Sequence, residues 1–236
     1  SSVSFFISRK RSCQMKKKIL IIDFGSQYSQ LIARRIREME VYCEIVHSSH
    51  VMTAISKEKE NILGVILSGG PESVYEENSP TVEKELFSLN IPILGICYGM
   101  QLIAHLNGGT VEKAESKEFG KASLEILEIE NPLFENVKQH SQIWMSHGDH
   151  ITKLPDGFKV IAQTNTSIAA IMNNSNIYAL QFHPEVSHSI FGKEILENFI
   201  FKICKCEKNW KIKSFIEEET KKIKDTVKDD KVILGL

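Results

Sequence analysis

Hydrophobic residues in the first half of the chain alternate between short continuous runs and runs with helical spacing. In the segment after the first continuous run, Leu31, Ile32, Ile36 and Met39 recur every three or four residues, which predicts a helix. Continuous apolar runs, which predict buried strands, occur in residues 18–27, 41–48, 62–73 and 91–99. Strands that are apolar on both faces and alternate with helices are typical of a parallel sheet covered on both sides.

Two further helices are predicted from their end signals. Residues 79–89 begin with Ser79 in a capping position and Pro80 in the first turn. Residues 100–106 are followed by Asn107 and Gly108, a typical helix stop.

The pattern changes from Thr110 onward, where short alternating segments are separated by turn residues. Strands are expected at residues 122–130, 158–164, 168–173 and 177–183. Helices are expected at residues 189–204 and, with a high content of charged residues, at 207–230. The predicted fold class is therefore α/β, with a mostly parallel open sheet flanked by helices and a mixed sheet in the second half.

Composition narrows the possible partners and compartment. The 236 residues carry a net charge of −1, so no global basic field favours nucleic acid or an anionic membrane, and neither is expected as a partner. No apolar run reaches the roughly 18 residues of a membrane span. The five cysteines are widely spread, which favours free thiols in a reducing compartment and predicts a cytoplasmic protein. No Cys or His spacing predicts a metal site.

The ends of the chain differ in character from its middle. We expect an N-terminal tail at 1–17, a main domain at 18–206, and a linker helix followed by the beginning of another domain at 207–236. The last prediction depends on the terminal "KVILGL", an apolar β-type run with no evident partner. An edge strand of the main sheet is the alternative.

One cysteine lies between two glycines at the end of an apolar run. Gly95, Cys97 and Gly99 have the spacing of a nucleophile elbow, in which a sharp strand-to-helix turn exposes the central residue. The pKa of a thiol at a helix N-terminus, about 8.5 when free, falls toward or below neutrality. Cys97 is therefore a candidate nucleophile, with a buried core cysteine as the alternative.

A base and an orienting group follow a later strand. His183, Pro184 and Glu185 come directly after residues 177–182, at the strand end where parallel sheets present catalytic groups. Glu185 is placed to accept a hydrogen bond from the imidazole of His183 and to fix its tautomer. A surface turn is the alternative for this tripeptide.

A glycine loop completes the candidate chemistry. Gly69 and Gly70 follow a strand and leave backbone N–H groups free to face an anion. Together with the amide of Tyr98, such a loop forms an oxyanion hole. A phosphate-binding loop is the other possibility, but neither of the common nucleotide-binding glycine signatures is present.

These motifs resemble those of the triad-type, or class I, glutamine amidotransferases. The segments that carry the resemblance are "DFGSQY", "LSGGPESVYEENSP", "GICYGMQ", "EFG", "WMSHGD", "QFHPEV" and "DDKVILGL". The first of them and "WMSHGD" point to the branch of the family that serves GMP synthesis. The likeness extends from about residue 18 to residue 236.

The resemblance implies a role for each matched residue. The catalytic triad would be Cys97, His183 and Glu185, with Gly70 and Tyr98 as the oxyanion hole. Gln101 would hold the backbone of L-glutamine, and Ser146, Gly148 and Asp149 would line its amino-acid end. No metal and no cofactor are implied for this domain.

The resemblance also implies a partner. In the family's GMP branch, a C-terminal ATP-pyrophosphatase domain of the same polypeptide uses ATP and Mg²⁺ to aminate XMP, and "KVILGL" resembles the strand that leads into its phosphate loop. Two other readings remain open. In the first, the domain would be inactive alone and would act as a docking and regulatory module. In the second, the elbow would belong to an unrelated cysteine protein of the papain or DJ-1 type.

Overall fold

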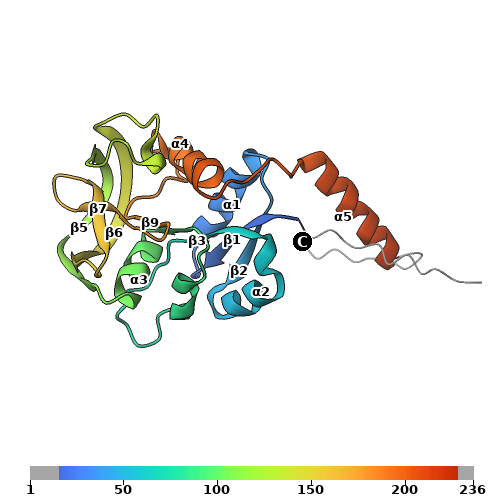
Figure 1. Cartoon of the computed structure of the whole chain (residues 1–236), viewed down its shortest axis with the longest axis horizontal. Coiled ribbons are helices and arrows are strands. Elements are labelled where there is room, and N and C mark those ends of the chain that lie inside the picture. Colours follow the sequence, from blue (N-terminus) through green and yellow to red (C-terminus); the bar gives the residue numbers. More distant parts are fainter. Residues whose placement is uncertain (1–15, 228–236) are drawn as a thin grey trace, which may run out of the picture.

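A computed structural model describes residues 16–227 of the chain (Figure 1). The expected N-terminal tail up to residue 15 and the terminal "KVILGL" lie outside the described residues. The strands are β1 (Lys18–Asp23), β2 (Cys43–His47), β3 (Ile62–Leu67), β4 (Ile93–Ile96), β5 (Thr110–Ile126), β6 (Ser141–Lys153), β7 (Phe158–Gln163), β8 (Ile168–Asn173) and β9 (Ile177–Leu180). The helices are α1 (Tyr28–Glu38), α2 (Val51–Glu58), α3 (Tyr98–Leu106), α4 (Gly192–Glu197) and α5 (Ile212–Val227), and a π-helical segment (Asn198–Ile203) continues α4.

The strands form one sheet in the order β2-β1-β3-β4-β9-β8-β7-β5-β6. The strands from β2 to β9 in this order are parallel, whereas β9, β8, β7, β5 and β6 pair antiparallel. The strand β9 joins the two parts, because it lies beside β4 although more than 80 residues separate them along the chain. This arrangement confirms the predicted fold class.

Hydrophobic cores fill both faces of the parallel part. One core includes Ile19 and Ile21 of β1 with Ile32 and Ile36 of α1, and the other includes Leu20 of β1 with residues of α2 and α3. Figure 1 shows α1 and α4 on one side of the sheet and α2 and α3 on the other, with α5 extending away from the body. Alternate side chains of a strand point to opposite faces, so a continuous apolar run serves both cores.

Several elements differ from the sequence-based prediction. The helix expected at 79–89 is wrong, because only Lys84–Ser88 form a short 3₁₀ helix. The Ser79 hydroxyl donates to the Val74 carbonyl, and the Tyr98 hydroxyl donates to the Pro80 carbonyl (2.5 Å). One bond is local and the other comes from α3, and together they hold the expected first turn as a loop. Helix α2 and strand β6 were not predicted.

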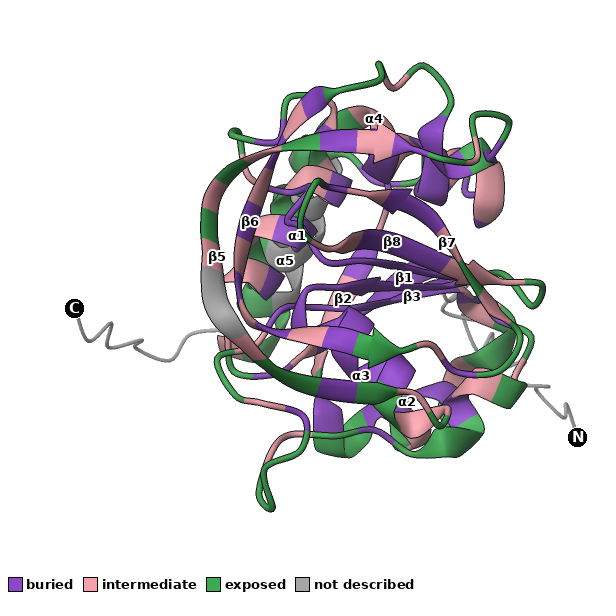
Figure 2. Ribbon diagram, turned by 90° about the vertical axis from the view of Figure 1, so that its left-hand side faces the viewer, coloured by how far each residue is buried: buried purple, intermediate pink, exposed green. Residues whose placement is uncertain are grey.

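The remaining predicted strands and helices within the described residues are confirmed, with shifts of a few residues at their ends. One strand is longer than expected, because β5 begins at Thr110 rather than Ala122. None of the helices described for this chain is long and apolar enough to cross a membrane. Figure 2 shows the buried strands in the middle of the molecule and the long β5 and β6 pair at one side.

Candidate active site at the strand ends

The candidate nucleophile lies on a strained turn between β4 and α3. Cys97 has φ of 53° and ψ of −105°, a backbone conformation that costs a non-glycine residue on the order of 1–3 kcal/mol. A methyl group at Gly95 would lie 2.7 Å from the Gly99 carbonyl oxygen, and one at Gly99 would overlap the Leu67 carbonyl. Both glycines of the predicted elbow are therefore required by close packing, as in other nucleophile elbows.

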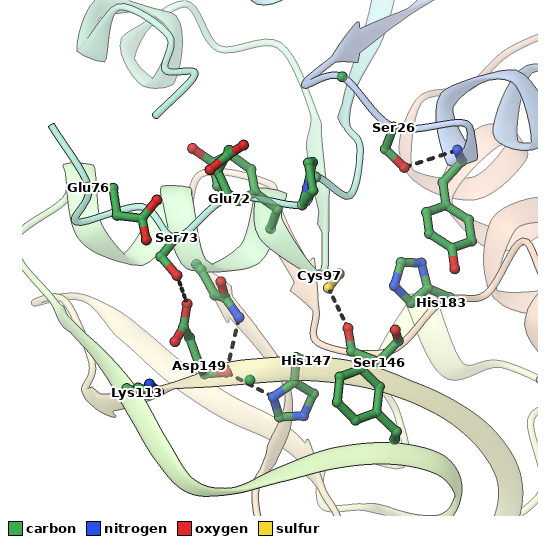
Figure 3. Close-up of a pocket in the computed structure, with 18 of the residues that line it drawn as sticks. Ser26, Glu72, Ser73, Glu76, Cys97, Lys113, Ser146, His147, Asp149 and His183 are labelled. Atoms are coloured by element: carbon green, nitrogen blue, oxygen red, sulfur yellow. Dashed lines mark hydrogen bonds between the residues drawn. The ribbon is translucent and has the colours of Figure 1, made fainter. Parts of the chain in front are cut away.

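His183 lies beside the cysteine (Figure 3) and forms a buried pair with Glu185. The Nδ1 atom of His183 lies 2.7 Å from Oε1 of Glu185, and their side chains are 2% and 0% exposed. Burial disfavours the charged imidazole, but the Glu185 carboxylate and the Cys97 side chain outweigh it and hold the pKa of His183 well above its usual value. The pairing leaves Nε2 of His183 for contact with the cysteine sulfur.

Further contacts hold the ring and the backbone of His183. The ring of Tyr28, at the start of α1, lies over it with 4.5 Å between ring centroids. The Ser189 hydroxyl donates to the His183 carbonyl (2.6 Å) and accepts from the backbone N–H of Trp144 in β6 (3.1 Å). The loop after β9 is therefore attached to β6, which also carries the opposite wall of the pocket.

The two residues proposed as oxyanion donors, Gly70 and Tyr98, lie close together and line the same pocket as Cys97. A methyl group at Gly70 would lie 3.2 Å from the Tyr98 ring, and one at Gly69 would lie 3.0 Å from Cε1 of His183. The glycine loop thus covers the triad closely. Among residues 16–227, neither the Gly70 nor the Tyr98 amide donates to a backbone carbonyl. Both N–H groups remain available for an anion, as an oxyanion hole requires.

The other end of the pocket is acidic and is held by hydroxyl groups. The two carboxylate oxygens of Asp149 accept from Ser73 Oγ (2.5 Å) and from the Tyr75 hydroxyl (2.9 Å), as Figure 3 shows for Ser73. Glu72 and Glu76 line the same region. These three carboxylates outnumber Lys113, the one lysine among the described residues that line the pocket, so this end is suited to a ligand's ammonium group.

Two glutamine side chains connect this end to the nucleophile. Gln101 is buried, and its Nε2 donates to the Asp149 carbonyl (3.1 Å) and to Oε1 of Gln181 (3.3 Å). His147 also contacts the Asp149 carbonyl through Nδ1 (2.8 Å), while its Nε2 faces the Glu118 carboxylate (3.0 Å). Burial opposes ionisation of Glu118, but hydrogen bonds from Thr166, Ser167 and His147 lower its pKa.

An open pocket of about 530 Å³ lies between the two ends of the site. The predicted site residues that line it are Gly70, Cys97, Tyr98, Gln101, Ser146, Gly148, Asp149 and His183. Glu185 lies behind His183, out of the pocket. Nowhere in residues 16–227 do His, Cys, Asp or Glu side chains gather in a group able to hold a metal ion.

Sequence reasoning missed the residues that support the predicted ones. Gln181 lies two residues before His183, and because side chains two apart in a strand share a face, this position was open to prediction. Ser73 and Tyr75 follow the glycine loop, but their contact with Asp149 joins residues more than 70 positions apart. No local pattern indicates such a contact.

Comparisons with known proteins agree on one family. Residues 20–203 match the family model described as glutamine amidotransferase class-I. The chain is 56% identical over 221 residues to a GMP synthase [glutamine-hydrolyzing] of Brachyspira hyodysenteriae and 54% identical over 222 residues to that of Mesoplasma florum. These alignments cover 93% of this chain but only 42% and 43% of the relatives, so the chain spans less than half their length.

Solved structures give the same result. A proposed GMP synthase component of Thermoplasma acidophilum superposes with a TM-score of 0.67 at 31% identity, covering 87% of this chain and 98% of that one. A glutamine amidotransferase of Thermotoga maritima, at 20% identity and a TM-score of 0.59, covers 90% of this chain and 93% of that one and supports the fold alone.

Proposed function

The chain belongs to the class-I glutamine amidotransferase family, and from this premise we propose that it hydrolyses L-glutamine to glutamate and ammonia with Cys97 as nucleophile. The observation that carries the proposal is that the Cys97 thiol shares one pocket with His183, whose imidazole is paired from behind with the buried Glu185. A thiol beside an imidazole that a carboxylate orients is the arrangement used for nucleophilic attack on an amide.

The first half of the reaction forms a thioester. His183 accepts the thiol proton at Nε2, and the sulfur attacks the side-chain carbonyl carbon of glutamine. The oxygen becomes an oxyanion that receives hydrogen bonds from the Gly70 and Tyr98 amides. When the oxyanion collapses, the carbon–nitrogen bond breaks, and His183 returns the proton to the departing ammonia.

The second half releases glutamate. A water molecule gives a proton to His183 and attacks the thioester, and the carbon–sulfur bond then breaks. The proton on His183 returns to the sulfur, so the triad ends as it began. Glu185 keeps the imidazole in the tautomer with Nδ1–H and stabilises the imidazolium in both halves.

The amino-acid part of glutamine is proposed to lie at the acidic end of the pocket. Asp149, with Ser146 and Gly148 of the same strand, faces its ammonium group, and Gln101 holds its backbone. The carboxylate of Asp149 is already oriented by two hydroxyl donors, so little ordering is needed when the substrate binds.

The ammonia is proposed to serve GMP synthesis in the cytoplasm. The relatives named as GMP synthases are more than twice as long as the matched region, and the additional length is proposed to be a C-terminal ATP-pyrophosphatase domain. That domain would bind ATP, Mg²⁺ and XMP and would use the ammonia to form GMP. The expected boundaries, 18–206 for the glutaminase and 207–236 for the linker and the beginning of the next domain, belong to this proposal.

The alternative of a docking module without activity of its own is not favoured. An inactive module does not require a strained cysteine, and its backbone cost would persist without a use. The nucleophile, the base and two free amides also lie together in one pocket of this chain.

A glutaminase assay tests the proposal. The chain is incubated with L-glutamine, and ammonia and glutamate are measured beside a Cys97→Ala control. Ammonia release that the control lacks is expected. As a second readout, a glutamine-analogue electrophile such as 6-diazo-5-oxo-L-norleucine is expected to label Cys97. Absence of both ammonia and label, in a folded protein, would remove the assignment.

A further inference from the structure

A buried amide lies against the candidate nucleophile. Gln181 is 1% exposed and follows directly after β9, and its Nε2 atom is 3.8 Å from the Cys97 sulfur. Its backbone is fixed, because its N–H donates to the Ala169 carbonyl (2.9 Å). The triad mechanism described above gives no role to this side chain.

The hydrogen-bond network decides which end of the amide faces the sulfur. The Asp149 carbonyl can only accept a hydrogen bond, so Gln101 must present its NH₂ group there. The same NH₂ group contacts Gln181, which must therefore present its oxygen to Gln101. The NH₂ group of Gln181 is left pointing at the sulfur of Cys97.

The sulfur needs such a donor when it loses its proton. As a thiol it donates to the Ser146 carbonyl (3.5 Å). As a thiolate it can only accept, and the carbonyl then faces it as a second centre of negative charge. The donors that reach it from the described residues are His183 and Gln181. Both can donate to the thiolate before it attacks the substrate, and the amide donates without giving up its proton.

We propose that Gln181 is a further catalytic residue, whose side-chain N–H donates to the Cys97 sulfur and stabilises the thiolate. The inference rests on the proposed function for its place in turnover. The hydrogen bond supports the thiolate before attack, weakens when the sulfur becomes part of the neutral thioester, and forms again when glutamate leaves. Proton transfer still takes place between the sulfur and His183.

The network also connects substrate recognition to the nucleophile. Gln101 lines the pocket and orients Gln181, while Asp149 supplies the carbonyl that orients Gln101. Two hydrogen bonds thus connect Gln101 to the sulfur: one from Gln101 to Gln181, and one from Gln181 to Cys97. A ligand bound at Asp149 and Gln101 lies at the start of this connection. This relay requires a fixed amide orientation at both glutamines.

The test measures the rate at which iodoacetamide alkylates Cys97 as a function of pH, by mass spectrometry of the Cys97 peptide. Gln181→Met keeps a side chain of similar length but removes the donor. We expect the pH midpoint of alkylation to rise by about 0.5 to 1 unit, a roughly three- to tenfold lower rate below the midpoint. Gln181→Glu, which presents only acceptors when ionised, should raise the midpoint further.

Two more variants keep the test decisive. Gln163→Met removes a side-chain donor elsewhere in the same sheet, where Gln163 bonds to Glu125, and should leave the midpoint unchanged. Gln101→Met removes the group that orients Gln181 without touching the sulfur, and should shift the midpoint in the same direction by a smaller amount. It supplies the answer should the Gln181 variants fail to fold.

Unchanged midpoints in the folded Gln181 or Gln101 variants would overturn the inference. Alkylation by iodoacetamide does not depend on glutamine turnover, so the two proposals fail separately. A wild-type chain that releases no ammonia but shows the shifts would remove the glutaminase assignment and leave the thiolate donor. If the wild-type chain turns over glutamine but the variants show no shift, the glutaminase assignment stands and the role of Gln181 is removed.

Discussion

The parallel and antiparallel parts of the sheet hold the two ends of the pocket by different means. The parallel part places Cys97 by backbone packing, through a strained turn closed by Gly95 and Gly99. The antiparallel part holds Asp149 by side-chain hydrogen bonds from a loop more than 70 residues away. The reactive cysteine thus depends on close backbone packing. Substrate recognition depends on individual side-chain hydrogen bonds, each of which one substitution can remove.

The largest effect is expected where the two parts meet at His183. His183→Ala removes the group that takes and returns every proton, so kcat should fall by about 10² to 10⁴. The KM for glutamine should change little, because His183 does not hold the amino-acid end. A steady-state assay at several glutamine concentrations separates these parameters, and an unchanged kcat would exclude His183 as the base.

Glu185→Gln should give the next largest effect. The amide still accepts from Nδ1–H but has lost the negative charge that supports the imidazolium, so turnover should fall roughly 10²-fold while glutamine binding is kept. Glu185 raises the pKa of His183, so its removal lowers that pKa. The alkaline limb of the kcat profile should therefore move to lower pH. A limb that stays in place would show that Glu185 does not act on His183 through its charge.

Gly99→Ala tests the rigid side of the comparison. The added methyl group would overlap the Leu67 carbonyl, so the backbone must shift at a cost of about 1–3 kcal/mol in the free energy of unfolding. Gly157→Ala is the control, since it has open space but a φ of 80°, and should cost about 1 kcal/mol. Denaturant unfolding measures both. Equal losses would mean that close packing at the elbow matters less than we infer.

The smallest effect is expected at the substrate end. Tyr75→Phe removes one of two hydroxyl donors to Asp149, and Tyr75 is 45% exposed, so water can replace the bond. We expect KM to rise about two- to fivefold with kcat almost unchanged. A change confined to kcat would place Tyr75 in the chemistry rather than in recognition.

The same contrast explains what could be predicted from the sequence. The elbow and the His183-Pro184-Glu185 segment are local patterns, and the structure places them together as the parallel sheet requires. Strand β6 was missed because its buried positions alternate but include Ser141, His147 and Asp149, whose polar side chains hide the apolar pattern. His147 and Asp149 are buried because they line the pocket and bond to its other groups.

Helix α2 was missed for a different reason. It has eight residues, and only Val51 and Ile55 are buried, which is too few for a clear periodic signal. The failed helix at 79–89 had good end signals, but the Ser79 hydroxyl bonds to Val74 instead of capping the helix, and the Tyr98 hydroxyl of α3 takes the Pro80 carbonyl. Local preference is a weak guide where distant groups compete for the same backbone.

The most direct test of the account is capture of the acyl-enzyme. The chain and the Glu185→Gln variant, in which both half-reactions should be slowed, are mixed with L-glutamine, quenched in acid during turnover and digested, and the Cys97 peptide is examined by mass spectrometry. We predict a glutamyl thioester on Cys97 that is absent from Cys97→Ala. Ammonia release without any adduct on Cys97 in either protein, or an adduct on another residue, would contradict the account.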